Sequence, residues 1–158
     1  MKKFPLFVGV SLIAILLLLA SRSILAQSDP LVGTWKLNQA KSIYDPGPGP
    51  QSAVHKYEST GKDSYKITRD SVDATGKASH GEAPIVFDGN VHPQNNETSI
   101  MDRRIDAYNL EGMSMKGGKI TRVFFRFVSA DGKTLTFKTM GIDSAGKWLS
   151  IVEIYEKQ

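Results

Sequence analysis

The segment LVGTWKLN, residues 31–38, decides the fold class that the sequence predicts. Its odd-numbered positions are apolar except for Gly33, and its even-numbered positions from 34 to 38 are polar. Because side chains alternate between the two faces of a β-strand, this pattern predicts a strand with one buried face that contains Trp35. Gly33 has no side chain beside the large indole, so it permits another part of the chain to approach closely.

A secretory signal pattern precedes this segment. Two lysines form a positive start, residues 4–20 are almost wholly apolar, and Ala26 is a small residue suited to the cleavage point. We therefore predict a signal peptide over residues 1–26 and one exported domain over residues 27–158, located in the periplasm or outside the cell, with no stable membrane insertion after cleavage. The alternative is an uncleaved anchor, because the apolar run is at the short limit for a membrane span.

The composition limits the chemistry open to the exported chain. It has no cysteine, which excludes disulfides, thiolate metal sites and lipid attachment at an N-terminal cysteine. Lys2, Lys3 and Arg22 leave with the leader, so the 20 basic residues fall to 17 against 16 acidic ones. Net charge therefore gives no reason to expect a nucleic-acid partner. The 132 residues left after removing 26 from 158 suffice for one domain with a real core.

The rest of the chain alternates short apolar segments with turns that contain Gly, Asp or Asn. Strands are predicted, without any helical period, at residues 53–60, 64–70, 99–105, 110–116, 119–128, 133–142 and 147–157. Residues 72–79 are a weak strand candidate, residues 85–87 are a short apolar run, and residues 91–98 are predicted to be a loop. We expect an all-β protein, an antiparallel up-and-down meander of about eight or nine strands that closes into a lipocalin-like β-barrel with the last strand beside the first.

Six short stretches spread over the mature chain carry a family resemblance: GTWKLN at 33–38, AKS at 40–42, PGP at 46–48, RIDA at 104–107, DGKTLT at 131–136 and YEK at 155–157. With them the chain resembles a group of small exported bacterial lipocalin-like proteins of unknown function, which are barrels of the calycin type. The resemblance implies the barrel fold and export, and it implies no activity.

The last predicted strand contains Glu153-x-Tyr155, a weaker resemblance to the fatty-acid-binding proteins, whose final strand holds a carboxylate with Arg-x-Tyr. The glutamate at the arginine position would repel a carboxylate, so that site is not carried over. Those proteins also place a helix pair after their first strand, where this chain has the proline-rich residues 46–50. Lipocalins set a late arginine against the tryptophan of Gly-x-Trp, and here no arginine follows Arg126.

No pattern of residues indicates catalysis or a metal site. His55, His80 and His92 show neither His-x-His nor His-Glu-x-x-His spacing, and a site made of His80, Glu82 and His92 is less plausible than solvated loop residues. The sequence has no Gly-x-Ser-x-Gly motif for an activated serine. We therefore expect a protein that is not an enzyme and has no cofactor or metal.

The alternation within each predicted strand identifies side chains expected to face the barrel interior: Trp35, Tyr65, Ile67, Phe87, Phe125, Phe127, Leu135, Phe137 and Tyr155. Most of them are large and apolar, so the expected partner is a small apolar or amphipathic molecule. Arg69 and Glu153 share faces with these residues and should orient the ligand, or pair with each other or with water, unless both lie at the barrel mouth in solvent. The candidate ligand-binding residues are Trp35, Tyr65, Arg69, Phe125, Phe127, Phe137, Glu153 and Tyr155.

Three hypotheses follow for the function. The first is an exported, non-enzymatic barrel that binds a small apolar or amphipathic ligand inside. The second is a ligand-free envelope or interaction protein whose barrel is filled by its own side chains, and the strands at 119–128 and 147–157 favour it because both of their faces are apolar. The third, an enzyme that uses inward Arg, Glu and Tyr, requires convergent titratable groups. Analogy of fold favours the first.

Overall fold

The computed structural model describes residues 29–143 and 145–158, so the predicted signal peptide lies outside the described residues. One short 3₁₀ helix, η1 (Gln39–Lys41), follows the first strand. The strands are, in chain order, β1 (Gly33–Leu37), β2 (Ile43–Asp45), β3 (Ser52–Gly61), β4 (Ser64–Val72), β5 (Ala78–Val86), β6 (Asp88–Pro93), β7 (Thr98–Arg104), β8 (Asn109–Lys116), β9 (Lys119–Val128), β10 (Thr134–Ile142) and β11 (Trp148–Lys157).

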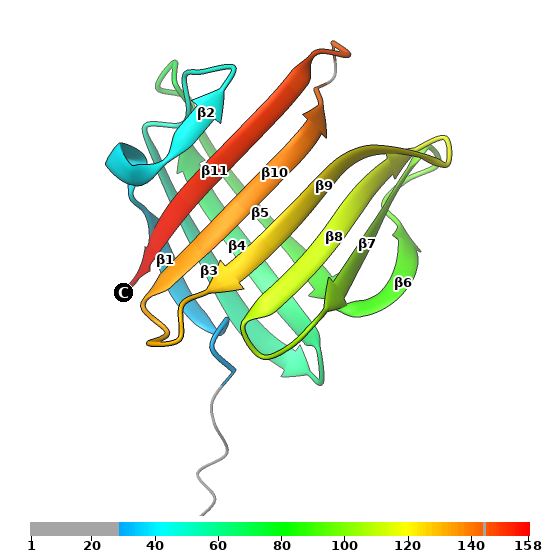
Figure 1. Cartoon of the computed structure of the whole chain (residues 1–158), viewed down its shortest axis with the longest axis horizontal. Helices are drawn as coiled ribbons and strands as arrows, with labels where there is room; N and C mark the ends of the chain where they lie inside the picture. The colour runs from blue at the N-terminus through cyan, green and yellow to red at the C-terminus, as the bar shows by residue number, and fades with distance from the viewer. Residues whose placement is uncertain (1–28, 144) are drawn as a thin grey trace, which may run out of the picture.

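All the strands belong to one antiparallel sheet that curves into a nearly closed barrel (Figure 1). The strand order is β5-β4-β3-β1-β11-β10-β9-β8-β7-β6, and β2 pairs with β11. The predicted pairing of the last strand with the first is confirmed, since Trp35 lies opposite Lys157 in the ladder between β1 and β11. The predicted fold class, an all-β antiparallel barrel, is confirmed as well.

The sheet has eleven strands, more than the eight or nine expected. Two of the additional ones, β5 and β6, lie where the sequence indicated only a weak strand and a loop, so the loop predicted at 91–98 was wrong for its first three residues. Both strands are edges of the sheet and are exposed along most of their length. A strand exposed on both faces has no apolar alternation, and this is the signal on which the prediction depended.

Phe87 is the single residue between β5 and β6, and it bridges the two edges at one end of the barrel. Its N–H donates to the carbonyl oxygen of Asp63 (2.8 Å), and its carbonyl oxygen accepts from the N–H of Arg104 (3.3 Å). We name this end, which also carries residues 29–31, the closed end, and the opposite one, with the β8–β9 and β10–β11 turns, the open end (Figure 1). No ladder joins β5 to β6 in the part of the chain that the structure describes.

Trp35 is the centre of the core at the closed end. Its side chain is completely buried, and its indole N–H donates to the carbonyl oxygen of Leu31 (2.8 Å). The Lys157 ammonium lies 4.9 Å from the indole centroid and donates to the carbonyl oxygen of Pro30 (3.0 Å). A lysine of the last strand thus lies against the tryptophan, where lipocalins set their late arginine.

Gly33 is required by this packing. Its φ of +136° is one that side-chain-bearing residues rarely adopt, and a Cβ at this position would lie 2.6 Å from Cε of Lys157. The Gly-x-Trp pair therefore acts as a unit, because the glycine leaves the space through which the lysine reaches the indole.

The chain between β1 and β3 holds only the three-residue η1 and the short β2, as the proline-rich segment led us to expect. Within residues 29–143 and 145–158, no helix has the length and apolar character needed to cross a membrane.

We expect Trp35→Ala to lower the free energy of unfolding by about 3–5 kcal/mol, because it empties a fully buried aromatic site. Trp148→Ala is the matched control, since Trp148 is 63% exposed and its loss should cost less than about 0.5 kcal/mol. Denaturant unfolding followed by circular dichroism measures both changes. Equal unfolding midpoints for the two variants would contradict the central position of Trp35.

Candidate functional site

A charged pair lies inside the barrel. Arg126 on β9 and Asp102 on β7 are only 2% and 1% exposed, and Nη1 of Arg126 donates to Oδ1 of Asp102 at 2.9 Å. Burial by itself lowers the pKa of Arg126, but Tyr57 and Asp102 outweigh that effect, so the guanidinium stays charged. Burial raises the pKa of the Asp102 carboxyl, and the neighbouring guanidinium opposes the rise. Charges this deep are costly, which makes the pair a candidate for function rather than for packing.

Gly112 on β8 makes room for this pair. Asp102, Gly112 and Phe124 are successive cross-strand neighbours on the inner face of β7, β8 and β9. A Cβ at Gly112 would lie 2.6 Å from Oδ1 of Asp102 and 2.3 Å from the ring of Phe124. The absent side chain therefore lets the Asp102 carboxylate reach across β8 to the arginine on β9.

Three phenyl rings surround the Arg126 guanidinium. Its Cζ lies 5.3 Å from the ring centroids of Phe87 and Phe124 and 4.9 Å from that of Phe137. Aromatic faces attract cations, so these rings replace part of the lost water. Among the described residues Nε of Arg126 has no hydrogen-bond partner, which leaves a buried donor able to bind an acceptor.

A cavity of about 320 Å³ opens beside the pair, in the gap of the sheet between β5 and the strands β6 and β7. Arg69, Asp102 and Arg126 form its charged lining, and Ile85 and Ile100 belong to its apolar lining. Arg69 keeps contact with solvent at the opening, although partial burial lowers the pKa of its guanidinium. The cavity therefore combines an apolar wall with two cationic groups and one anionic group.

A second polar group lies on the inner face of β11. Glu153 accepts hydrogen bonds from the hydroxyls of Tyr44 (3.3 Å) and Tyr155 (3.2 Å), and burial raises the pKa of its carboxyl. Burial and the neighbouring Glu153 also raise the pKa of Tyr44 to about 12. Tyr155 stacks on His55 with 4.7 Å between ring centroids. The phenols thus remain protonated donors to this carboxyl group.

His55 is partly buried beside Tyr155 and stays in its neutral form. Burial, and after it the positive charges of Arg69 and Arg126, lower its pKa from 6.5 to about 3. A neutral histidine is consistent with an interior in which positive charge already exceeds negative charge near the cavity.

Arg69 and Glu153 were predicted to orient a ligand or to pair with each other or with water. The mutual pairing is wrong, because Arg69, on β4, lines the cavity, whereas Glu153, on β11, accepts hydrogen bonds from Tyr44 and Tyr155. The strands β3 and β1 separate β4 from β11 in the sheet. The ligand role of both residues stays a prediction.

The prediction that Phe125 and Phe127 face the interior is wrong. Phe127 is 40% exposed, and the two rings stack on the outer face with their centroids 6.0 Å apart. The inner face of β9 carries Phe124 and Arg126 instead. Because β9 is apolar on both faces, hydrophobicity alone does not indicate which face points inward. The register with β10 does, since it sets Arg126 opposite the inward-facing Phe137.

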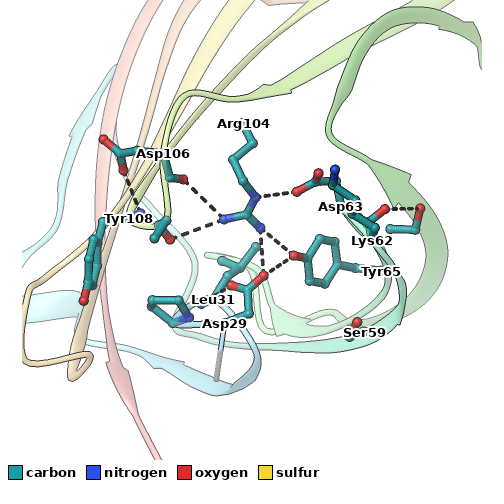
Figure 2. Close-up of polar contacts among 12 residues, drawn as sticks. Asp29, Leu31, Ser59, Lys62, Asp63, Tyr65, Arg104, Asp106 and Tyr108 are labelled. Atoms are coloured by element: carbon teal, nitrogen blue, oxygen red, sulfur yellow. Dashed lines mark hydrogen bonds and ion pairs between the residues drawn. The ribbon is translucent and has the colours of Figure 1, made fainter. Parts of the chain in front are cut away.

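Tyr65 faces inward but belongs to a polar network at the closed end (Figure 2). Arg104 donates through Nε to Oδ1 of Asp63 (2.7 Å) and through Nη2 to Oδ2 of Asp29 (2.8 Å) and to the Tyr65 hydroxyl, which itself donates to Asp29. Burial, and then the hydrogen bond to Asp29, raise the pKa of Tyr65 to about 12. Since these groups satisfy one another, the network holds the chain segments together at this end of the barrel.

The remaining predicted site residues, Trp35, Phe137 and Tyr155, face the interior as expected. Phe137 contacts the Arg126 guanidinium and Tyr155 contacts Glu153, whereas the polar atom of Trp35 is already satisfied at the closed end. That these three residues contact a ligand stays a prediction.

Sequence reasoning missed the pair of Arg126 and Asp102 and the role of His55. One available signal was Gly112, since an isolated glycine inside a strand often marks a close approach. A glycine of this kind indicates that other atoms pack closely at its position. It does not identify the residues to which those atoms belong, because they come from neighbouring strands.

The histidines on the surface each contact one carboxylate, His80 with Asp70 at 2.6 Å and His92 with Asp88 at 2.9 Å. In residues 29–143 and 145–158 no three His, Asp or Glu side chains are grouped so as to hold a metal ion.

We expect Asp102→Asn to destabilise the fold by about 3–5 kcal/mol, because it leaves the Arg126 charge buried and unpaired. The double variant Asp102→Leu/Arg126→Met removes both charges and should retain much more of the stability. Chemical denaturation at neutral pH measures all three proteins. An Asn variant as stable as the native protein would mean that Asp102 is not the counter-ion of Arg126.

The low pKa of His55 should make acid destabilise the protein. Unfolded His55 takes up a proton below about pH 6.5, whereas the folded residue does so only near pH 3. Between these values the unfolded state binds more protons, so the stability that His55 contributes is complete above pH 6.5 and falls as the pH drops toward 3.

His55→Asn should therefore flatten the acid limb of the stability curve. The raised pKa values of Asp102 and Glu153 act in the opposite direction, and subtracting the variant's curve from that of the native protein removes their shared effect. Unfolding free energies measured across this range test the expectation. A difference between the two proteins that does not change with pH would refute it.

No protein-family model matches the sequence, and a search of curated proteins gives no significant match. Among solved structures, the chain is similar to the wild-type fluorescent protein UnaG, with a TM-score of 0.54 and 12% identity over 81% of this chain and 97% of that one. It is also similar to As-p18, an extracellular fatty acid binding protein, with a TM-score of 0.51 and 15% identity over 82% of this chain and 97% of that one. At such identities the likeness shows the fold alone, an antiparallel β-barrel like those of these two proteins.

Proposed function

We propose that this protein is an exported, non-enzymatic binding barrel that holds one small amphipathic molecule with an acidic group near Arg126 and Arg69. The observation that carries the proposal is the buried guanidinium of Arg126, whose Nε lacks a partner among the described residues and which lines a cavity. A buried donor without an acceptor costs free energy, so a ligand oxygen at that position would recover it.

The charge around the cavity supports an acidic ligand group. Arg69 and Arg126 face one carboxylate, Asp102, and His55 nearby is neutral. A carboxylate, sulfonate or phosphate would balance the excess positive charge and accept charge-assisted hydrogen bonds. The apolar side chains of the cavity wall, among them Ile85 and Ile100, would contact the apolar part of the same molecule.

The size of the cavity points to a small ligand. Its volume of about 320 Å³ is at the lower end of the roughly 300–1,000 Å³ usual for small-molecule pockets. The similar structure As-p18 is an extracellular fatty acid binding protein, which adds support for an amphipathic acid as the class of ligand. Glu153 replaces the arginine of the Arg-x-Tyr pair in such proteins, so the acidic group is proposed beside Arg126 on β9 and away from β11.

Export rests on the leader sequence at residues 1–26 and on the family resemblance. A non-enzymatic role is proposed because the interior charges are engaged with one another, as Asp102 with Arg126 and Glu153 with two tyrosines, in place of a nucleophile aligned with a base.

The alternative of an interaction protein without a ligand is favoured by one observation, the large apolar side chains on the outer wall. Phe127 and Trp148 are 40% and 63% exposed there. An internal cavity and an outer contact surface are compatible, so the two roles can coexist in one barrel.

Probe titrations test the binding proposal. We expect saturable binding of the anionic fluorophore 8-anilinonaphthalene-1-sulfonate, and we expect Arg69→Met to weaken it roughly tenfold, which corresponds to about 1.4 kcal/mol for one charged contact. The uncharged dye Nile red should bind both proteins about equally, because the apolar wall is unchanged.

Lys36→Met is the matched control, since it removes the same charge from the outer face of β1, where Lys36 lies opposite Val54 and Glu156. Its affinity for the anionic probe should equal that of the native protein. Absence of saturable binding, or equal losses in the two variants, would refute an anion site in the cavity.

A further inference from the structure

Apolar side chains are exposed at the open end of the barrel. Ile120, Ile142 and Trp148 are 57%, 40% and 63% exposed. Together with Val123 and Met140 they line a groove of about 290 Å³ on β9, β10 and β11. We name these five residues the rim patch. Soluble proteins seldom gather several large apolar side chains on the surface unless they contact something.

The rim patch is built by a close approach of β9 and β10. Gly141 has a φ of +149°, and a Cβ there would lie 2.2 Å from the carbonyl oxygen of Thr121. The two backbones therefore come together at a point that only glycine permits. Nε of Arg122 donates to the carbonyl oxygen of Ile142 at 3.1 Å, which fixes the strand ends beside each other.

Basic residues adjoin the rim patch. Lys119 precedes Ile120, Lys147 precedes Trp148, and Lys138 lies two positions from Met140 on the same strand face. Among the residues that the structure describes, none of these lysines has a carboxylate within salt-bridge distance. The nearby Asp143 stabilises the β10–β11 turn, because its Oδ1 accepts hydrogen bonds from the N–H groups of residues 145 and 147 at 2.8 and 2.9 Å. The surroundings of the patch are therefore cationic.

We propose that the rim patch docks the open end of the barrel onto the surface of an anionic lipid bilayer. Tryptophan is favoured at the boundary between headgroups and acyl chains, and lysines beside it attract anionic headgroups. Ile120 and Ile142 would bury additional apolar area at this boundary between headgroups and acyl chains. Charge decides against a second copy of this chain, since a patch-to-patch dimer would bring two sets of unpaired lysines together.

The proposal does not depend on an internal ligand. The rim patch lies on the outer face of β9 to β11, whereas Arg126 and the cavity lie on the inner face and in the gap beside β5. Loss of docking and loss of internal binding are therefore separate outcomes, and each can fail while the other stands.

Vesicle binding tests the proposal on the chain that begins at Gln27. The eleven described strands and their pairings are all present in this form, and it lacks the apolar leader, which would itself enter a bilayer. We expect cosedimentation with vesicles of phosphatidylcholine and phosphatidylglycerol in equal amounts, little with phosphatidylcholine alone, and release by added salt. The emission of Trp148 should move to shorter wavelength, because the only other tryptophan, Trp35, is already buried.

Paired variants locate the contact. Ile142→Ser and Lys147→Glu should each weaken partition onto the mixed vesicles roughly tenfold. Ile105→Ser is the matched control, since Ile105 is 53% exposed at the closed end and should leave the partition unchanged. Circular dichroism confirms that each variant keeps the β-sheet signal of the native protein.

Three results would overturn the proposal. The first is no binding to the anionic vesicles. The second is equal loss in Ile142→Ser and Ile105→Ser. The third is a dimer in sedimentation velocity, without lipid, that Trp148→Ser dissociates, because it would make a second copy the occupant of the patch.

Discussion

A charge buried inside a β-barrel has to be matched by its surroundings, and Arg126 imposes this condition on the whole interior. Asp102 supplies the counter-charge from β7, and Gly112 leaves the space that lets it do so. Burial, and after it the positive charges of Arg69 and Arg126, lower the pKa of His55 and keep it neutral. What remains unmatched, a buried N–H of Arg126 and an excess of positive charge, belongs to side chains that line the cavity, and the proposed acidic group would bind there.

The closed end of the barrel stabilises the fold, and the proposed binding sites lie away from it. At the closed end, Trp35 under Lys157 and the Arg104 network satisfy their own polar atoms and hold the strand ends together. Away from that end, the sheet leaves a gap between β5 and β6 in which the cavity opens, with Arg69 in contact with solvent, and Trp148 is exposed at the open end. A barrel whose strands are held together at one end can tolerate sequence changes at the other end without a shift in strand pairing.

The sequence was sufficient for most of the fold and for little of the site. The alternation around Trp35 predicted its burial, because one face of that strand is apolar and the other is polar. The meander of short strands predicted the closure of β11 on β1, which removes both edges of the sheet. It failed on β9, where both faces are apolar and one inward residue is a charged Arg126. The partners that make that charge tolerable, Asp102 and Phe137, come from other strands, so only the assembled sheet reveals them.

Native mass spectrometry of the protein purified from its own host can detect an amphipathic acid inside the barrel, because a ligand held beside Arg126 should survive gentle transfer from solution. We expect a species heavier than the chain that begins at Gln27, which loses the extra mass on denaturation and releases a molecule detected as a negative ion. The bare chain alone in every preparation, including one exposed to a mixture of lipid acids, would contradict it.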